Sequence, residues 1–592
     1  MQILILAAGM GNRLRPLTDE VPKVMVKIGG KEMIKHQLDL VTKLPDVSEI
    51  IIVVGYKKEL IKSLIGKRYH QIKIKYVENN NYKTTNNVYS VHLALKHIKE
   101  NTLLLEGDVI FKPCLLKRIV RDKNTVFVEK FKPYMDGGVV EIDENSKIKR
   151  LISKQEQQEG FKYDECYKTV NIYHFTYNFI SKYYKPALSL YIKAYGKKDY
   201  YELVIGSLVY MKVCSLYAEV LEENMLWFEI DDLIDLSYAE HLFLRKDFEF
   251  IKHKYGGYWN YNFVDFCYLY NVYFPSPKLA AEITANATEL INSYPSGQQY
   301  NKLLLSSFFH HRINLSHLFV GNGASEIITI LNHQLIDSVT IPVPTFDEYL
   351  TISDKKLINQ FVLSEKTGFQ INVEALIKSA RKTNYLVLVN PNNPTGQCLT
   401  VDEVAKVLNS LKKLKGIILD ESFIDFSDEQ SALGLVDKYK NLIYLKSISK
   451  SYGVPGIRLG FVYTKNKLAL AVLNRYLPIW NINSFAEKFM EKFGKFQDDY
   501  LRSLQLVKKD RLEFTSKLED IGLKVFPSQA NFLLCQLPAK SISNLALTAK
   551  LFAKDNIYIK DLNNKMGSRY LRLTVRKPAD NEKLINALEK YL

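Results

Sequence analysis

The sequence predicts an α/β protein with two domains, each built on a largely parallel sheet. Short apolar runs alternate with helical patterns along the chain, which is the order typical of parallel sheets. A strand followed by a polar or glycine-containing loop opens a domain twice, at the start of the chain and again beyond Gly256-Gly257. With 592 residues the chain is also too long for one ordinary core, so more than one domain is expected.

Four apolar runs in the N-terminal part predict buried strands. They are the run that follows Met1 and the runs at residues 49–56, 72–78 and 101–111. A helical pattern fills residues 33–44, and residues 225–250 are typical of one closing helix. The first domain is therefore expected to span residues 1–248.

The C-terminal part repeats this organisation in a second α/β domain, expected at residues 249–592. Its apolar runs each end in a polar loop, at residues 339–344, 385–396, 416–422 and 442–453. Ligands of open α/β sheets gather at the carboxyl ends of strands, so these loops are candidate site segments. Residues 290–490 are expected to form a large α/β part, and the flanking segments a small α+β part.

The composition excludes several classes of protein. The chain is 47% hydrophobic and 24% charged, which excludes a disordered or collagen-like chain. No apolar run reaches the ~18 residues that a membrane span needs. Six scattered cysteines without a CxxC pair argue against a disulfide scaffold or a zinc ribbon and favour a cytoplasmic protein. The net charge of +17 is spread along the chain, so we expect small anionic substrates and neither nucleic acid nor a membrane as partner.

A phosphate-binding loop follows the first strand. It reads Leu6-Ala7-Ala8-Gly9-Met10-Gly11-Asn12-Arg13, with Pro22-Lys23 ten residues further on. Small residues let backbone N–H groups approach a phosphate chain closely. Arg13 and Lys23 are placed to stabilise charge that develops on a phosphoryl group, which is the main requirement of phosphoryl and nucleotidyl transfer. The loop lacks the Walker pattern and the third glycine of the dinucleotide fingerprint.

Residues 6–23 resemble the signature LAAGxGxRLxPxTxxxPK of the sugar-1-phosphate and phosphocholine nucleotidyltransferase family. The resemblance covers about residues 1–245 and implies a Rossmann-like nucleotidyltransferase domain in which Arg13 and Lys23 are catalytic. The nucleotide-binding residues that it implies are Leu6, Ala7, Ala8, Gly9, Gly11, Arg13, Lys23, Asn86, Asn87, Ser90, Glu106 and Asp108.

Two aspartates are candidate Mg²⁺ ligands. Asp108 ends a buried apolar run, where a carboxylate is placed to hold Mg²⁺ against phosphate oxygens. Asp231, in Trp-Phe-Glu-Ile-Asp, matches the second metal aspartate of the family. Asp232 and Asp235 are rivals for that role.

The nucleotide and the acceptor follow from the same resemblance. The stretch around residues 86–90 resembles the NNxYS stretch of the phosphocholine cytidylyltransferase branch, which implies CTP. That branch activates small phosphorylated or phosphonate amines. The candidate acceptor-binding residues are Asp136, Lys154, Lys168 and Asn171.

The C-terminal part carries the set of residues that pyridoxal phosphate (PLP) requires. Lys450 lies in a polar loop, with Asp420 upstream and Arg458 downstream. A lysine amine binds this cofactor covalently, an aspartate keeps the pyridine nitrogen protonated, and a helix N-terminus with an arginine holds the phosphate.

This part resembles the fold-type I class I/II aminotransferases, and within them the histidinol-phosphate aminotransferase group, from about Gly256 to the C-terminus. The motifs that carry the resemblance are NPNNPTG at 390–396 and SxSKxxGxxGxRxG at 447–460. It implies PLP on Lys450, held by Gly323, Ala324, Ser325, Phe346, Asn393, Asp420, Ser447, Ser449 and Arg458. It also implies a substrate site at Asn271, Tyr294 and Arg572, with Tyr294 donated across a homodimer interface.

One position departs from that family. Three residues after Asp420 the family usually has a tyrosine that donates a hydrogen bond to the cofactor ring oxygen, and this chain has Phe423. The spelling DESFIDF also resembles the threonine-phosphate decarboxylase side of the family. Transamination and decarboxylation therefore both stay open.

The whole chain resembles fused phosphonate cytidylyltransferase/2-aminoethylphosphonate aminotransferase proteins. The resemblance implies Mg²⁺-dependent transfer of CMP from CTP to 2-aminoethylphosphonate with release of pyrophosphate. It further implies PLP-dependent transamination between phosphonoacetaldehyde and 2-aminoethylphosphonate. The alternative joins a phosphocholine or phosphoethanolamine cytidylyltransferase to a phospho-amino-acid decarboxylase or a histidinol-phosphate-like aminotransferase.

Overall fold

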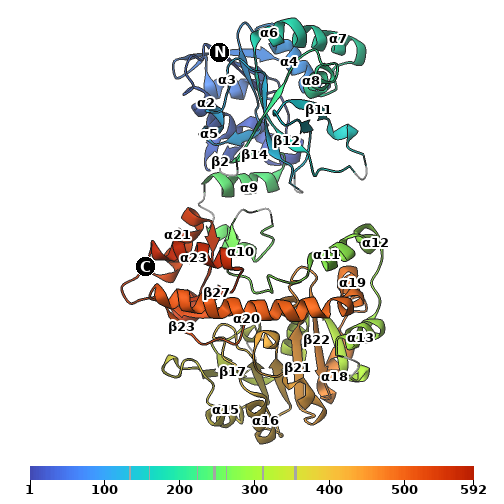
Figure 1. The fold of residues 1–592 in the computed structure, drawn as a ribbon, viewed down its shortest axis with the longest axis vertical. Helices are drawn as coiled ribbons and strands as arrows, with labels where there is room; N and C mark the ends of the chain where they lie inside the picture. The colour runs from blue at the N-terminus through green and yellow to red at the C-terminus, as the bar shows by residue number, and fades with distance from the viewer. Residues whose placement is uncertain are drawn as a thin grey trace. The chain divides into compact units, whose positions relative to one another are not determined.

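The computed structural model of the chain separates into two compact units, Met1–Tyr261 and Asn262–Leu592 (Figure 1). The division lies later in the chain than the expected boundary after residue 248. The residues described are 1–132, 135–158, 161–222, 225–244, 248–259, 261, 263–309, 313–351 and 357–592. Each unit is an α/β structure, as the sequence predicts.

The first unit is built on a mixed sheet whose centre is parallel. The four parallel strands confirm the apolar runs of the sequence and are β1 (Gln2–Ala7), β4 (Glu49–Val54), β6 (Ile72–Glu78) and β7 (Thr102–Glu106). In the sheet, β7 and β4 flank β1, and β6 lies beyond β4. The long strand β12 (Tyr167–Phe175) continues the sheet antiparallel to β7.

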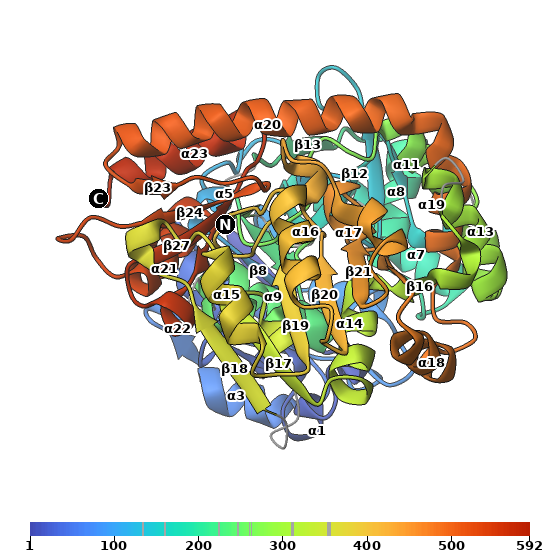
Figure 2. The ribbon, with the colours of Figure 1, turned by 90° about the horizontal axis from the view of Figure 1, so that it is seen from below.

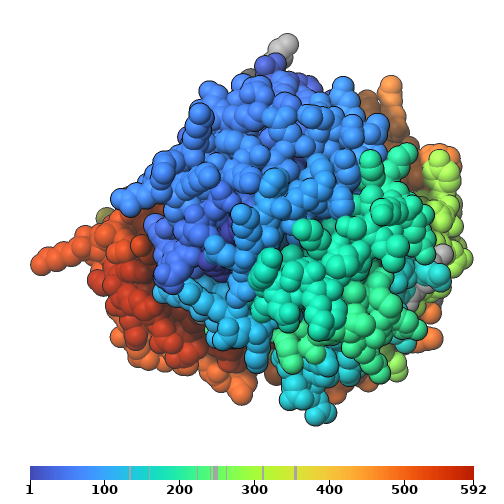
Figure 3. Space-filling model, turned by 90° about the horizontal axis from the view of Figure 1, so that it is seen from above, coloured from blue at the N-terminus to red at the C-terminus, as the bar shows by residue number. Residues whose placement is uncertain are grey.

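Helices cover both faces of this sheet, and successive side chains along each central strand are buried on opposite faces. Ile3 and Ile5 of β1 face the helices α2 (Met33–Val41), α3 (Lys58–Ile65) and α5 (Pro113–Leu116). Leu4 faces the opposite layer, which contains α4 (Asn87–Ala94), α7 (Lys185–Tyr195) and α8 (Tyr201–Tyr210). Figure 3 shows the face where blue segments from the beginning of the chain border the teal segments, and α4 contacts both α7 and α8.

The closing segment of the first unit differs from the single helix predicted for residues 225–250. It begins as a strand, β14 (Trp227–Glu229), which pairs antiparallel with β8 (Val109–Phe111). Two helices follow, α9 (Leu233–Leu244) and α10 (Phe248–Lys254), and residues 245–247 between them lie outside the described residues. The aromatic residues at the start of this segment favour a strand edge over a helix.

The second unit contains a seven-stranded sheet in the order β16-β22-β21-β20-β19-β17-β18, part of which can be followed in Figure 2. The strands are β16 (Leu318–Asn322), β17 (Ser338–Val343), β18 (Leu357–Val362), β19 (Tyr385–Val389), β20 (Gly416–Asp420), β21 (Leu442–Ser447) and β22 (Leu459–Thr464). All are parallel except β22, which runs antiparallel to both of its neighbours. The beginning of β22 therefore lies at the same edge as the carboxyl ends of the other strands.

Helical layers again cover both faces of the sheet. One face packs against α14 (Gly323–Gln334) and α18 (Lys467–Tyr476). The other packs against α15 (Val373–Ala380), α16 (Val401–Ser410) and α19 (Ser484–Phe493). The long helix α20 (Gln497–Asp520) runs along the second unit in Figures 1 and 2.

A smaller α+β part completes the second unit. Its four-stranded sheet has the order β23-β24-β27-β26. The strands are β23 (Lys524–Phe526), β24 (Phe532–Gln536), β26 (Lys560–Asp561) and β27 (Tyr570–Thr574). The helices α21 (Asn544–Asp555) and α23 (Pro578–Glu589) pack on it, and Phe266 joins the same core. Among the described residues, no helix combines the length and the hydropathy that a membrane crossing requires.

Candidate active sites

A cavity of about 930 Å³ opens at the carboxyl ends of β1 and β7 in the first unit. Every residue that the sequence predicted for this domain lines it. These residues are Leu6, Ala7, Ala8, Gly9, Gly11, Arg13, Lys23, Asn86, Asn87, Ser90, Glu106, Asp108, Asp136, Lys154, Lys168, Asn171 and Asp231. Segments that are far apart in the sequence therefore meet around one space.

The glycine loop brings Lys23 into the cavity wall. Gly11 has a φ of +65°, and a Cβ at this position would lie 2.9 Å from the Cβ of Lys23. The hydroxyl of Thr18 donates to the Gly11 carbonyl at 2.8 Å. A side chain at position 11 would therefore be strained and would also displace Lys23.

Lys23 joins the two aspartates that the sequence singled out. Its Nζ lies 2.5 Å from Asp108 Oδ2 and 2.9 Å from Asp231 Oδ1. A guanidinium nitrogen of Arg13 lies 2.8 Å from the same oxygen of Asp231. Burial opposes the charge on Lys23, but Asp108 and Asp231 outweigh it and raise the pKa of the amine above its ordinary value.

The two rival aspartates, Asp232 and Asp235, accept backbone hydrogen bonds at the start of α9. Asp235 accepts the backbone N–H groups of Asp231 and Asp232 at 2.9 and 3.2 Å. Asp232 accepts those of Ile234 and Asp235 at 2.8 and 2.9 Å. Both carboxylates thus order the turn that carries Asp231, and among the three aspartates it is Asp231 that shares the Lys23 ammonium group with Asp108.

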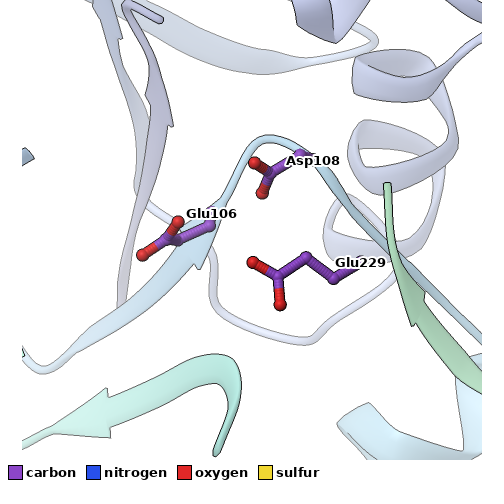
Figure 4. A group of neighbouring side chains, drawn as sticks. All are labelled: Glu106, Asp108 and Glu229. Atoms are coloured by element: carbon purple, nitrogen blue, oxygen red, sulfur yellow. The ribbon is translucent and has the colours of Figure 1, made fainter. Parts of the chain in front are cut away.

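A second carboxylate group surrounds Asp108. Glu106, Asp108 and Glu229 point toward one another in Figure 4, and one oxygen of each lies within 4.8 Å of the others. Glu229 arrives there because β14 pairs with β8 in a register that places it beside Val109. Asp108 Oδ1 is buried and has no hydrogen-bond partner among the described residues. Oxygen donors of this kind are the ligands that Mg²⁺ prefers, so this group is a second candidate donor set for the ion, beside Asp108 and Asp231.

Glu202, which the sequence analysis missed, is a further acidic group of the cavity. It lies on α8, and its Oε2 is buried without a hydrogen-bond partner among the described residues. Burial raises its pKa to about 7. Burial and the neighbouring carboxylates of Glu202, Asp108 and Glu229 likewise raise the pKa of Glu106. The cavity therefore gathers carboxylates whose negative charge burial makes unfavourable, and a bound cation would stabilise their ionised forms.

Replacing Glu202 by glutamine is expected to stabilise the first unit at pH 8. A carboxylate whose folded pKa is raised destabilises the fold once it ionises, so wild-type stability falls as pH rises from about 4.5 toward about 7. The Glu202→Gln gain is expected to be on the order of 1–3 kcal/mol at pH 8 and to shrink at pH 5. Thermal unfolding at the two pH values measures it, with the exposed Glu144→Gln as control. An equal effect at both pH values would contradict the assignment.

The predicted acceptor residues fall into two groups. Lys168 is buried, with its Nζ 3.3 Å from Glu229 Oε2 and 2.7 Å from the Thr169 carbonyl. Asn171 donates to the other oxygen of Glu229 at 3.1 Å. Asp136 and Lys154 instead form an ion pair with each other at the exposed rim. The cavity thus has a buried lysine inside and an exposed ion pair at its rim.

The residues predicted beside the nucleotide base are anchored by α4. Asn86 caps this helix and accepts the N–H of Asn87 at 2.8 Å. Asn87 accepts the N–H of Tyr201 at 3.1 Å and donates to Glu106 at 3.4 Å. Ser90 is buried and accepts from Asn79 at 3.1 Å. These contacts hold the start of α4 against the cavity.

The second unit gathers its predicted residues at one edge of the sheet. Asp420 ends β20, and Lys450 lies on α17 (Ile448–Ser451) directly after β21. Phe346 follows β17, and Asn393 follows β19. Arg458 precedes the antiparallel strand β22, so it reaches the same edge.

Lys450 lies in a strongly cationic environment. It is buried, and burial together with Arg572 and Arg458 lowers the pKa of its amine to about 8, although Asp420 acts in the opposite direction. A lysine with this pKa has a substantial neutral fraction near pH 8. Neutral amines are the nucleophilic form and also the form that accepts protons.

Asp420 is held by a tyrosine that the sequence analysis did not identify. Tyr349 is fully buried and donates its hydroxyl to Asp420 Oδ2 at 2.8 Å. Ser422 donates to Asp420 Oδ1 through its hydroxyl at 2.5 Å and its N–H at 3.0 Å. Burial nevertheless raises the pKa of Asp420. The sequence signal that could have pointed to Tyr349 is its position, three residues after the predicted cofactor-binding residue Phe346.

An anion cradle forms where α14 begins. Arg458 donates to the hydroxyl of Ser325 at 2.9 Å. Gly323 has a φ of +75°, and a Cβ there would lie 2.7 Å from the Arg458 guanidinium. Ser449 accepts the N–H of Leu459 at 3.2 Å, which ties the Lys450 helix to the start of β22. Together with the buried Lys450 amine, this cradle fits the phosphate and aldehyde of PLP.

Arg572 faces the same edge, and among the described residues its hydrogen bonds go to uncharged acceptors. It donates to Asn393 Oδ1 at 2.7 Å and to the Cys267 carbonyl at 2.6 Å. Its Nε is buried without a hydrogen-bond partner among the described residues. A buried guanidinium with a free donor suits an incoming carboxylate or phosphonate.

Three residues that the sequence analysis named make contacts away from the sheet-edge site: Asn271, Phe423 and Tyr294. Asn271 directs its amide to the Ser451 carbonyl at 2.9 Å and to Ser503 at 2.8 Å, so it supports the Lys450 helix from behind. Phe423 is buried and packs edge-on against Phe532. Tyr294 is 81% exposed in this single chain and contacts the Trp480 ring in a tilted arrangement.

Comparison with known proteins assigns each unit to a family. Residues 2–223 match the Nucleotidyl transferase family, and residues 265–588 match Aminotransferase class I and II. The chain is 30% identical to a CMP-5'-(3-aminopropyl)phosphonate synthase of Streptomyces rubellomurinus, over 100% of this chain and 95% of that protein. It is 29% identical to an L-serine phosphate decarboxylase of Sulfurospirillum multivorans, over 56% of this chain and 88% of that protein.

A solved structure supports the fold of the second unit. The histidinol-phosphate aminotransferase from Clostridium acetobutylicum is 28% identical, with a TM-score of 0.50. The match covers 55% of this chain and 98% of that one. The second unit therefore has the fold of PLP-dependent aminotransferases, and the chain as a whole joins a nucleotidyltransferase to it.

Proposed function

We propose that this chain, which belongs to the class I and II aminotransferase family and carries a nucleotidyl transferase unit before it, makes and activates an aminophosphonate. The first unit transfers CMP from CTP to 2-aminoethylphosphonate and releases pyrophosphate. The second unit transfers an amino group between phosphonoacetaldehyde and 2-aminoethylphosphonate. The observation that carries the proposal is one cavity that is lined by the glycine loop with Arg13 and Lys23 and also by a group of carboxylates.

The cavity suits an acceptor with an anionic and a cationic end. Lys168 is a buried cation in position to bind a phosphonate, with Lys154 at the rim. Glu202, whose Oε2 is unpartnered among the described residues, is available to an ammonium group. The relative from Streptomyces rubellomurinus makes a CMP-linked 3-aminopropylphosphonate, which differs from 2-aminoethylphosphonate by one methylene group. These observations favour a primary aminoalkylphosphonate.

The proposed reaction of the first unit is an in-line displacement. A phosphonate oxygen forms a bond to the α-phosphorus of CTP while the bond to the bridging oxygen breaks, and pyrophosphate leaves. Mg²⁺, when bound at Asp108 and Asp231, neutralises charge on the triphosphate. Arg13 and Lys23 leave their present ion pairs with Asp231 and stabilise the phosphoryl oxygens instead.

The choice of CTP is tested by a panel of nucleotides. Pyrophosphate release is measured with CTP, UTP and dTTP at equal concentration, each with 2-aminoethylphosphonate and Mg²⁺. We expect release with CTP alone. Equal release with UTP would remove the base assignment and leave the transfer chemistry intact.

In the second unit, PLP supplies an electron sink that acidifies the carbon beside the substrate nitrogen. Asp420, held by Tyr349 and Ser422, would keep the pyridine nitrogen of bound PLP protonated. Nζ of Lys450 takes the proton from the substrate carbon and returns it at another atom. Arg572 binds the anionic end of the substrate, and Arg458 with Ser325 holds the cofactor phosphate.

Decarboxylation of a phosphorylated amino acid is the second candidate for this unit. Phe423 in place of the usual tyrosine favours it, as does the likeness to an L-serine phosphate decarboxylase. The two reactions differ in their need for a partner. We expect amino-group transfer to stop without a keto acid or aldehyde acceptor, whereas release of CO₂ from O-phosphoserine without one would establish the decarboxylase.

The second unit is expected to form a homodimer through an exposed apolar surface. Its residues are Ile291, Tyr294, Ile479 and Trp480, which are 72%, 81%, 68% and 54% exposed, and the rings of Tyr294 and Trp480 are in contact. Trp480→Lys is therefore expected to shift the chain from dimer to monomer in sedimentation equilibrium. Leu190→Lys, at an exposed leucine of the first unit, is the matched control. A wild-type monomer at micromolar concentration would contradict the expectation.

A further inference from the structure

We propose that the ammonium group of Lys23 blocks metal binding at Asp108 and Asp231 until a nucleoside triphosphate binds that ammonium group. The divalent ion then enters together with the nucleotide. The inference rests on the proposed nucleotidyl transfer and concerns the order of binding. It starts from the position of one side chain between Asp108 and Asp231.

The ammonium group of Lys23 occupies the place of a cation between these carboxylates. It lies 2.5 Å from an oxygen of Asp108 and 2.9 Å from an oxygen of Asp231. Its side chain is only 13% exposed, so solvent screens this arrangement weakly. Asp231 Oδ1 is also 2.8 Å from Arg13, which means that this oxygen already faces two positive charges.

A divalent ion and this ammonium group exclude each other. An ion bound to Asp108 and Asp231 would lie within a few ångströms of Nζ, where repulsion in a half-buried site is strong. Asp108 Oδ1 is buried and has no hydrogen-bond partner among the described residues, so this oxygen is available to bind a metal. Asp108 and Asp231 can therefore bind a metal ion, but Lys23 blocks that binding.

A triphosphate resolves this competition because it offers Lys23 and Arg13 other anions. The glycine loop brings both cations to the same cavity, and Gly11 packs directly on the Lys23 side chain. Once phosphate oxygens bind these cations, Asp108 and Asp231 are free for the ion that accompanies the nucleotide. By linkage, metal and nucleotide then raise each other's affinity.

The test measures Mn²⁺ binding to the full chain without nucleotide, from the free-ion EPR signal. We expect Lys23→Met to lower the Mn²⁺ Kd by roughly tenfold or more, because a unit charge close to the ion is removed. Lys23→Arg keeps the charge and is expected to keep the wild-type Kd. Lys31→Met removes a lysine paired with Asp39 outside the cavity and is the matched control. Lys23→Gln replaces Lys23→Met if the latter does not fold.

A second substitution locates the ion. In the Lys23→Met background, Asp231→Asn is expected to remove most of the gain, whereas Glu229→Gln is expected to retain it. An unchanged Kd in Lys23→Met, or a gain that depends on Glu229 and not on Asp231, overturns the proposal. Metal affinity is read without CTP or acceptor, so its outcome is separate from that of the proposed reaction. A tighter Mn²⁺ site in a chain that transfers no CMP would leave this inference standing and remove the proposed function.

Discussion

Replacing Lys450 by alanine is expected to abolish the chemistry of the second unit and to leave CMP transfer unchanged. Lys450 is buried at the sheet edge, and its lowered pKa of about 8 makes it the amine poised to bind the cofactor and to move the substrate proton. We expect a loss on the order of 10³-fold or more in amino-group transfer or decarboxylation. The variant is also expected to lose the visible absorbance of covalently bound PLP.

The control for this variant is Lys415→Ala, which removes a half-exposed lysine paired with Asp337 at the other edge of the second unit's sheet. Both activities should survive that change. If Lys450→Ala eliminates CMP transfer as well, in a chain that folds normally by circular dichroism, the two sites do not work independently.

Replacing Asp108 by asparagine is expected to produce the opposite pattern. Asp108 contacts Lys23 and belongs both to the Asp108–Asp231 pair and to the group with Glu106 and Glu229. Its loss removes a charged ligand for Mg²⁺, for which we expect a decrease on the order of 10²–10³-fold in CMP transfer. Amino-group chemistry should remain at the wild-type level.

Asp122→Asn, at an exposed turn of the first unit, is the control for the Asp108 variant. Pyrophosphate release and PLP absorbance are measured on the same preparation. Retention of CMP transfer in Asp108→Asn would show that the ion is held without this carboxylate. The proposed role of Asp108 would then be wrong.

The strand-end motifs were predictable from the sequence because their residues are local. The glycine loop, Arg13 and Lys23 follow one strand, and Asp420 and Lys450 each follow another, so position along the chain already places them at a sheet edge. Every residue predicted for the first cavity indeed lines it. Their individual roles remain predictions.

The acidic wall of the cavity was not predictable in the same way. Glu229 reaches Asp108 only through the pairing of β14 with β8, a contact between distant segments. The same pairing explains why a single helix over residues 225–250 was the wrong prediction. Glu202 enters from α8, and Tyr349 reaches Asp420 from a short 3-10 helix 71 residues away in the sequence. Such non-local contacts depend on packing, which helical or strand periodicity does not encode.

The most direct test of the central claim is phosphorus NMR of the full chain with CTP, Mg²⁺ and one acceptor at a time. The acceptors are 2-aminoethylphosphonate, phosphoethanolamine and phosphocholine. We expect coupled resonances of a mixed phosphonate–phosphate anhydride, together with pyrophosphate, only when 2-aminoethylphosphonate is present. A new anhydride formed only with phosphoethanolamine or phosphocholine would contradict the phosphonate assignment.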